Sequence, residues 1–112
     1  MLELIAIGFS ADQRASIRLE PGHPLRIGRG EQMEMTIPWD PHLSRHHLTL
    51  VSQDDDTVRL TAEGSAANPV FAAGQPVTDT SLAAGDFFVI DQHIIGPFQT
   101  DGLVAVFRQL LS

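Results

Sequence analysis

The 112-residue chain contains no cysteine and no lysine. Without cysteine, disulfide bonds, cysteine-ligated zinc and thiol catalysis are excluded, so the core alone must hold the fold together. A cytoplasmic location agrees with this composition and is our expectation. Without lysine, the chain has neither a P-loop lysine nor a Schiff-base lysine. All seven basic residues are arginines, whose planar guanidinium binds phosphate or carboxylate through two parallel hydrogen bonds.

Positive charge and long apolar runs are also scarce. The net charge is −7 at pH 7 and the isoelectric point is near 4.9, so the average field repels a phosphate backbone and nucleic acid is not an expected partner. The opening residues 1–9 include Glu3, lack a basic residue and are too short to span a membrane. We expect a strand there, and neither a signal peptide nor a membrane helix.

Short segments of alternating apolar and polar residues make up most of the chain. The alternation occurs in residues 15–20, 46–51 and 57–63, and residues 87–90 are continuously apolar. Half-buried strands produce a period of two, and fully buried strands produce continuous apolar runs. A further strand is expected within residues 93–99. Because glycine, proline and aspartate turns separate these segments, the pattern predicts one domain with an all-β sandwich fold.

The last residues break this alternation. Asp101 can cap a helix, and five apolar residues follow at helical spacing: Leu103, Val106, Phe107, Leu110 and Leu111. We therefore divide the chain into a sandwich at residues 1–100 and a short C-terminal amphipathic helix or tail at residues 101–112. The helix packs either on the sandwich or on a partner, and in the second case this segment could form a dimer.

Ser44, His47 and Asp40 together contain the residue types of a hydrolytic triad. The serine does not lie in a Gly-x-Ser-x-Gly turn, and the chain has no glycine-rich loop that could form an oxyanion hole. Residues this close in sequence also rarely converge on one reacting atom. We therefore expect a protein that is not an enzyme.

Metal and cofactor sites are not expected either. A metal needs three or four convergent ligands, whereas His46 and His47 are neighbours that point to opposite faces of a strand. The remaining histidines are scattered: His23, His42 and His93. The acidic residues 54–56 could bind a cation, but an exposed hairpin tip is the simpler interpretation.

Three of the seven arginines lie within residues 25–50. Arg29 follows the end of an expected strand, and a second loop presents Ser44 and Arg45. Two guanidinium groups and a hydroxyl are suited to hold a phosphate dianion. The alternative is a surface ion pair between Arg29 and a nearby acidic residue, which could be Glu31, Glu34 or Asp40. Such a pair contributes at most about 1 kcal/mol, and the residues alone leave both interpretations open.

These motifs resemble the forkhead-associated (FHA) domain, a family of phosphopeptide readers. The family pattern has Gly-Arg at a strand end, then Asp-x-x-(Val/Ile)-Ser-Arg-x-His, then Ser-x-Asn-Gly-Thr-x-Val-Asn-Gly, then Leu-x-x-Gly-Asp. The corresponding segments follow in the same order here, at residues 28–29, 40–47, 65–74 and 82–86. The resemblance extends over residues 2–99 and implies a sandwich of about eleven strands whose loops bind phosphothreonine peptides.

The resemblance also assigns roles to single residues. Arg29 and Ser44 match the family's phosphate ligands, and Arg45 lies where some members make a second contact. Asn68 matches the asparagine that binds the peptide backbone. Two positions match structural residues that brace the binding loop: Gly28 and His47.

The third segment departs from the family pattern. Ala67 replaces a residue that often offers a hydroxyl to the phosphate, and Pro69 replaces glycine, which removes a backbone donor. The expected function is a signalling module that binds a phosphothreonine segment of a partner or of its parent protein. The alternative is a protein-interaction module of the same fold without phosphate dependence, which assembles through the sandwich face or through residues 106–111.

Overall fold

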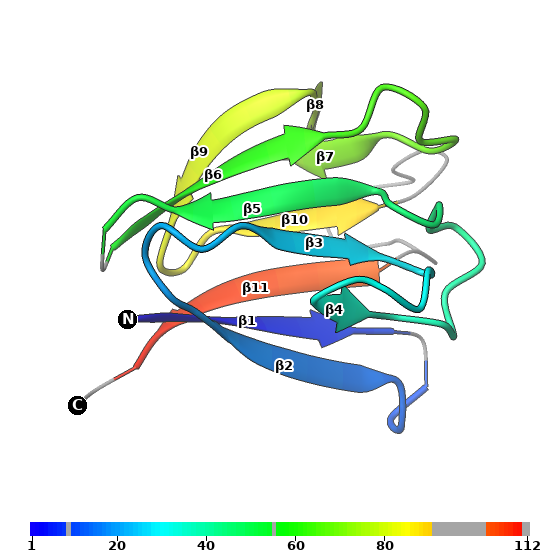
Figure 1. Ribbon diagram of the computed structural model, residues 1–112, viewed down its shortest axis with the longest axis horizontal. Helices are drawn as coiled ribbons and strands as arrows, with labels where there is room; N and C mark the ends of the chain where they lie inside the picture. Colours follow the sequence, from blue (N-terminus) through cyan, green and yellow to red (C-terminus); the bar gives the residue numbers. More distant parts are fainter. Residues whose placement is uncertain (9, 55, 91–102, 111–112) are drawn as a thin grey trace.

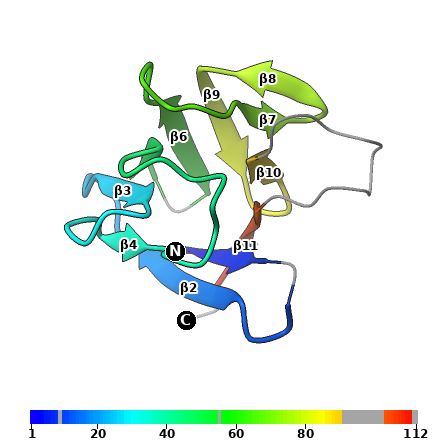
Figure 2. The ribbon, with the colours of Figure 1, turned by 90° about the vertical axis from the view of Figure 1, so that its right-hand side faces the viewer.

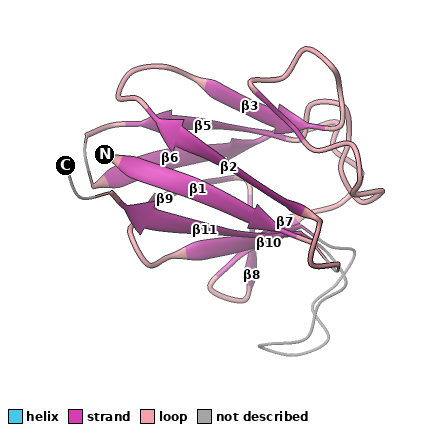
Figure 3. Ribbon diagram, turned by 90° about the horizontal axis from the view of Figure 1, so that it is seen from below, coloured by secondary structure: helices cyan, strands magenta, loops and turns pink. Residues whose placement is uncertain are grey.

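Eleven β-strands form two packed sheets in the computed structural model, which describes residues 1–8, 10–54, 56–90 and 103–110 (Figure 1). Every described element is a strand or a loop (Figure 3). The all-β sandwich expected from the sequence is therefore confirmed. The strand expected within residues 93–99 lies outside the described residues. No helix among the described residues is long and apolar enough to cross a membrane.

The larger sheet has six antiparallel strands in the order β2-β1-β11-β10-β7-β8. In that order their bounds are Arg14–Leu19, Leu2–Ile7, Leu103–Gln109, Phe87–Ile90, Val70–Ala72 and Gln75–Val77. Alternate residues of β1 are buried, namely Leu2, Leu4 and Ala6. β1 thus has one face in the core and one face outside, as its sequence period of two requires.

The smaller sheet has five strands in the order β4-β3-β5-β6-β9. In that order their bounds are Met35–Thr36, Leu25–Gly28, Leu48–Ser52, Thr57–Ala62 and Asp79–Ala83. The β3–β4 pairing is parallel, and the other pairings are antiparallel. The alternation of buried and exposed residues expected from the sequence is present in β6. It is absent at the start of residues 46–51, because residues 45–46 form a bend and the consecutive residues His47 and Leu48 are both buried.

The C-terminal segment is a strand, so the helix expected from the sequence was wrong. β11 pairs with β1 on one side and with β10 on the other. Its buried residues are Leu103, Ala105 and Phe107, with a period of two, while Val104 and Val106 are partly exposed. Leu103 and Phe107 satisfy both a helical and a strand period, and the β-branched valines suit a strand. The segment is a strand because it pairs with β1 and β10 on its two sides.

The buried faces of the two sheets form one apolar core. Within this core the ring centroids of Phe88 and Phe107 lie 5.8 Å apart with their planes tilted by 47°. The first residues of β1 and the last residues of β11 lie at one end of the sandwich, at the left of Figure 1. The β3–β4, β4–β5 and β6–β7 loops lie at the opposite end, which faces the viewer in Figure 2. The arginine-rich motifs belong to these loops.

Candidate functional site

Main-chain hydrogen bonds join the end of β3 to the loop that precedes β5. The Arg29 amide donates to the Ser44 carbonyl and the Gly30 amide to the Arg45 carbonyl, both at 3.0 Å. The two backbones touch at Gly28, where an added β-carbon would lie 2.0 Å from the Arg45 carbonyl oxygen. Only glycine permits this approach, because an obstructing backbone atom cannot move aside as a flexible side chain can. Gly28 thereby brings the two arginine-bearing loops together.

The Arg29 side chain is exposed and is held at one nitrogen. Its Nε donates to the Leu43 carbonyl oxygen at 2.7 Å. Within the described part of the chain, Arg29 forms no ion pair, and its two terminal nitrogens donate no hydrogen bond. One edge of the guanidinium is therefore fixed to the protein, and the terminal nitrogens remain available for a ligand.

The acidic residues that could have paired with Arg29 are used elsewhere or remain apart from it. Glu34 pairs with Arg26, whose Nη2 lies 2.7 Å from Glu34 Oε2. Asp40 is buried, and its Oδ1 accepts hydrogen bonds from the His42 amide and from the His42 ring. Glu31 lies near Arg29 without an ion pair to any described residue. The surface-pair interpretation of Arg29 is therefore incorrect for this structure.

A hollow of about 510 Å³ opens beside Arg29, and its lining residues are Arg29, Gly30, Glu31, Pro38 and Arg45. The Arg45 side chain is exposed and, like that of Arg29, has no ion pair with a described residue. Two positive charges thus face one space on a chain whose net charge is −7. Such a space attracts an anion, and guanidinium groups suit a planar or tetrahedral oxyanion.

Ser44 directly precedes Arg45 in the loop that contacts the end of β3. Its Oγ accepts a hydrogen bond from the Ala67 amide at 3.1 Å, which links the β4–β5 loop to the β6–β7 loop. The hydroxyl hydrogen of Ser44 is donated to no acceptor within the described residues. The hydroxyl can therefore donate to an anion while it keeps its bond to Ala67.

His47 is fully buried and braces the same loop. Its Nδ1 accepts a hydrogen bond from the Ser44 amide at 3.0 Å, and its Nε2 lies 2.8 Å from the Asn68 carbonyl oxygen. These partners place the proton on Nε2 of a neutral ring. Burial lowers the pKa of His47, and the Asn68 carbonyl and the Asp40 charge oppose this shift in part. Both ring nitrogens are occupied by main-chain groups, so the ring does not activate the Ser44 hydroxyl as in a catalytic triad.

Asn68 connects two of the loops through its side chain. Its Nδ2 donates to the His42 carbonyl oxygen at 2.9 Å. The resemblance implies a contact from Asn68 to a bound peptide, and its Oδ1 has no hydrogen-bond partner among the described residues that would prevent this contact. The bracing role of the Nδ2 atom was not apparent from the sequence, because His42 is separated from Asn68 by 26 residues.

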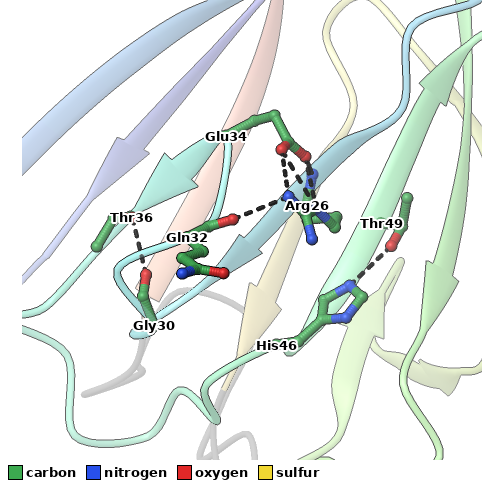
Figure 4. Close-up of polar contacts among 7 residues, drawn as sticks. All are labelled: Arg26, Gly30, Gln32, Glu34, Thr36, His46 and Thr49. Atoms are coloured by element: carbon green, nitrogen blue, oxygen red, sulfur yellow. Dashed lines mark hydrogen bonds and ion pairs between the residues drawn. The ribbon is translucent and has the colours of Figure 1, made fainter.

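The β3–β4 loop is braced by side chains that the sequence did not single out (Figure 4). Arg26 donates from Nε and Nη2 to the Glu34 carboxylate and from Nη2 to the Gln32 carbonyl oxygen at 2.8 Å. Thr36 Oγ1 donates to the Gly30 carbonyl oxygen at 2.8 Å. The hydrogen bonds from Arg26 lower the pKa of Glu34 to about 2, so this carboxylate is charged at neutral pH. The loop is thus held at both ends.

The described residues contain no group of three or more His, Asp or Glu side chains arranged for a metal ion. Asp54 Oδ1 accepts hydrogen bonds from the amides of Asp56 and Thr57. These bonds lower the pKa of Asp54 and form a tight hairpin tip. The acidic turn therefore has a structural explanation in its own main chain.

The fold is a small β-sandwich, and loops at one of its ends line a hollow that two arginines share. The sequence profile of the FHA domain matches residues 25–91, which is more than half of the chain, and the chain belongs to this family. FHA domains are generally modules without enzymatic activity that recognise phosphorylated segments. No curated protein sequence matches the chain significantly.

Several solved structures share the fold. The FHA domain of CT664 from Chlamydia trachomatis aligns with a TM-score of 0.77 at 17% identity, covering 98% of both chains. The FHA domain of FhaA, solved in complex with the intracellular domain of Rv3910, aligns with a TM-score of 0.72 at 21% identity and covers 96% of this chain and 100% of its own. A domain from a study of phosphothreonine-dependent FHA interactions aligns with a TM-score of 0.70 at 20% identity, covering 99% and 98%.

Proposed function

We propose that this FHA domain binds phosphorylated segments of a partner or of its parent protein at the loop end of the sandwich, with phosphothreonine as the preferred residue. One observation carries the proposal. Arg29 and Arg45 line one hollow, and neither forms an ion pair with a described residue. An anionic ligand would neutralise both charges, and a phosphate dianion can accept hydrogen bonds from both guanidinium groups.

Each residue has a role in the proposed complex. Arg29 binds the phosphate through its terminal nitrogens, because its Nε is already bonded to the Leu43 carbonyl. Ser44 donates its hydroxyl hydrogen, and Arg45 supplies the second charge. Asn68 holds the backbone of the peptide beside the phosphorylated residue. These donors belong to loops that are bonded to one another before any ligand arrives, so little ordering is needed on binding.

The preference for phosphothreonine is supported by the phosphothreonine-dependent interactions of one structural relative. The β6–β7 loop contributes less than the family pattern provides, because Ala67 has no hydroxyl and its amide is bonded to Ser44. One neutral hydrogen bond contributes about 0.5–1.5 kcal/mol and a charged one about 1.5–3 kcal/mol. The loss at position 67 therefore weakens the proposed binding, whereas the arginines supply most of it.

We further propose that the module acts in kinase signalling. The cytoplasmic location stays a prediction from the cysteine-free composition. A dimer would have to form through a surface other than the predicted helix, because the segment that was expected to form it is a central strand.

A titration with matched peptides tests the proposal. Phosphothreonine, phosphoserine and unmodified versions of one peptide library are titrated calorimetrically against the wild type, Arg29→Ala and Arg18→Ala. Arg18 is an exposed arginine on β2 without an ion pair among the described residues, so its variant makes the same charge change away from the hollow. We expect phosphate-dependent binding that falls by at least roughly ten- to a hundredfold in Arg29→Ala alone, because one charged hydrogen bond is equivalent to that factor and Arg29 offers two donors. Equal affinity for phosphorylated and unmodified peptides would instead support the interaction module without phosphate dependence.

A further inference from the structure

Glu31 is an acidic residue in the wall of a hollow that otherwise attracts anions. It lines the same space as Arg29 and Arg45. Its side chain is exposed and forms neither a hydrogen bond nor an ion pair with any described residue. Its charge is therefore not neutralised by either arginine through a direct contact. A site that bound phosphate alone would bind it better without this carboxylate.

The position of Glu31 is set by its two neighbours in the chain. The Gly30 carbonyl accepts a hydrogen bond from Thr36 Oγ1, and the Gln32 carbonyl accepts one from Arg26 Nη2, each at 2.8 Å (Figure 4). The Gly30 amide is also bonded to the Arg45 carbonyl at 3.0 Å. The chain is thus held on both sides of Glu31, and the carboxylate extends from a braced turn that lines the hollow.

We propose that Glu31 makes this hollow selective for phosphorylated segments that carry an arginine or lysine close to the phosphorylated residue. The inference rests on the proposed phosphopeptide binding and specifies the class of peptide. The arginines attract the phosphate, and Glu31 attracts the basic side chain beside it. Each charge of the ligand thus meets the opposite charge in the site. The same carboxylate repels a segment with an acidic residue at that place.

Pro38 strengthens the fit to a long basic side chain. It lines the same hollow as Glu31, and its ring is a rigid apolar surface. Lysine and arginine bury their methylene groups against such surfaces while the charged head reaches a carboxylate or water. The hollow therefore contains a partner for the stem and a partner for the charge of one basic residue.

The test compares peptides that differ in one flanking charge. Phosphothreonine peptides with arginine, alanine or aspartate at each position near the phosphate, and their unmodified versions, are titrated against the wild type, Glu31→Gln and Glu31→Arg. Glu20→Gln is the matched control, since Glu20 is exposed, directly follows β2 and does not line the hollow. At one or more positions, we expect the wild type and the control to bind the arginine peptide about two- to fivefold more tightly than the alanine peptide, the range of one exposed ion pair.

In Glu31→Gln this preference disappears, and in Glu31→Arg it reverses in favour of the aspartate peptide. High salt should also reduce it in the wild type, because an exposed pair is screened. Phosphate-dependent binding with the same arginine preference in the wild type and in both Glu31 variants, or with no preference in the wild type, overturns the role of Glu31 and leaves the proposed function intact. Equal binding of phosphorylated and unmodified peptides overturns the proposed function and this inference with it.

Discussion

The Arg45 carbonyl oxygen lies 2.0 Å from the point that a β-carbon on Gly28 would occupy. Such a contact is far shorter than any that a real side chain tolerates, and the Ser44 carbonyl oxygen would be only 2.8 Å from the same point. The end of β3 and the segment before β5 are therefore in direct backbone contact. Arg29 and Arg45 reach the same hollow because this contact exists.

Gly28→Ala should separate the two loops. The added methyl group meets backbone atoms, so β3 or the 44–45 segment must shift, and we expect the free energy of unfolding to fall by at least about 1–3 kcal/mol. Phosphopeptide affinity should fall as well, because the two guanidinium groups move apart. Gly64→Ala is the control, since a β-carbon there would have no neighbour within 4 Å. Equal denaturant midpoints for the two variants would contradict the steric role of Gly28.

Arg29→Lys should fail to restore phosphopeptide binding. A lysine has no Nε–H to donate to the Leu43 carbonyl, which Arg29 reaches at 2.7 Å, and its ammonium cannot present two parallel donors. We expect a loss of affinity close to that of Arg29→Ala, with thermal stability almost unchanged because the side chain is exposed. Calorimetric titration measures the affinity. Near-native binding by Arg29→Lys would show that a single positive charge is sufficient.

His47→Ala should lower the free energy of unfolding, because His47 braces the binding loop and does not itself contact the phosphate. The substitution removes the acceptor of the Ser44 amide and the donor to the Asn68 carbonyl. Each buried group left without a partner costs about 1–3 kcal/mol, so the free energy of unfolding should fall by several kcal/mol. Urea denaturation measures the change. A variant as stable as the wild type would exclude the bracing role.

The free energy of unfolding should decrease at acidic pH, because His47 is buried and its pKa is lowered in the folded protein. Burial holds the pKa of His47 in the folded protein below its unfolded value of about 6.5. Above about pH 6.5 His47 is neutral in both the folded and the unfolded protein, so its protonation does not reduce the free energy of unfolding. As the pH falls below the unfolded pKa, His47 is protonated in the unfolded chain and stays neutral in the folded protein. The free energy of unfolding therefore decreases by up to about 1.4 kcal/mol per pH unit. NMR titration of the His47 ring, alongside urea denaturation between pH 8 and pH 5, measures both effects; a pKa at or above the unfolded value would contradict the assignment.

Removal of residues 100–112 should prevent folding. β11 lies between β1 and β10, so its loss splits the larger sheet and exposes the core. A milder variant, Phe107→Ala, should lower the free energy of unfolding by about 3–5 kcal/mol, because the buried ring packs against Phe88. Val104→Ala is the control on the same strand, since Val104 is partly exposed. Circular dichroism and denaturation measure both, and a stably folded truncated chain would contradict the central place of β11.

The residues of the candidate site were predicted from the sequence, but their hydrogen-bond partners were not. The family pattern singled out Arg29, Ser44 and Arg45, and the structure brings them together at one end of the sandwich. Whether Arg29 is free for a ligand depends on where the nearby carboxylates lie in space. Glu34 pairs with Arg26 across the β3–β4 loop, and this choice of partner is a tertiary outcome that short sequence spacing does not determine.

The sequence by itself determined the strand periods of β2 and β6, because a half-buried strand requires alternating residues wherever it lies. The family pattern also marked Gly28 as a structural residue, whereas the reason that only glycine fits there, the approach of the Arg45 carbonyl oxygen, is a tertiary contact. The tertiary structure decided the conformation of residues 103–109. Their apolar positions satisfy both a helical and a strand period, and the hydrogen bonds of β1, about one hundred residues earlier, select the strand. Local patterns contain no information about such a distant partner, and burial between two existing strands outweighs a weak helical preference.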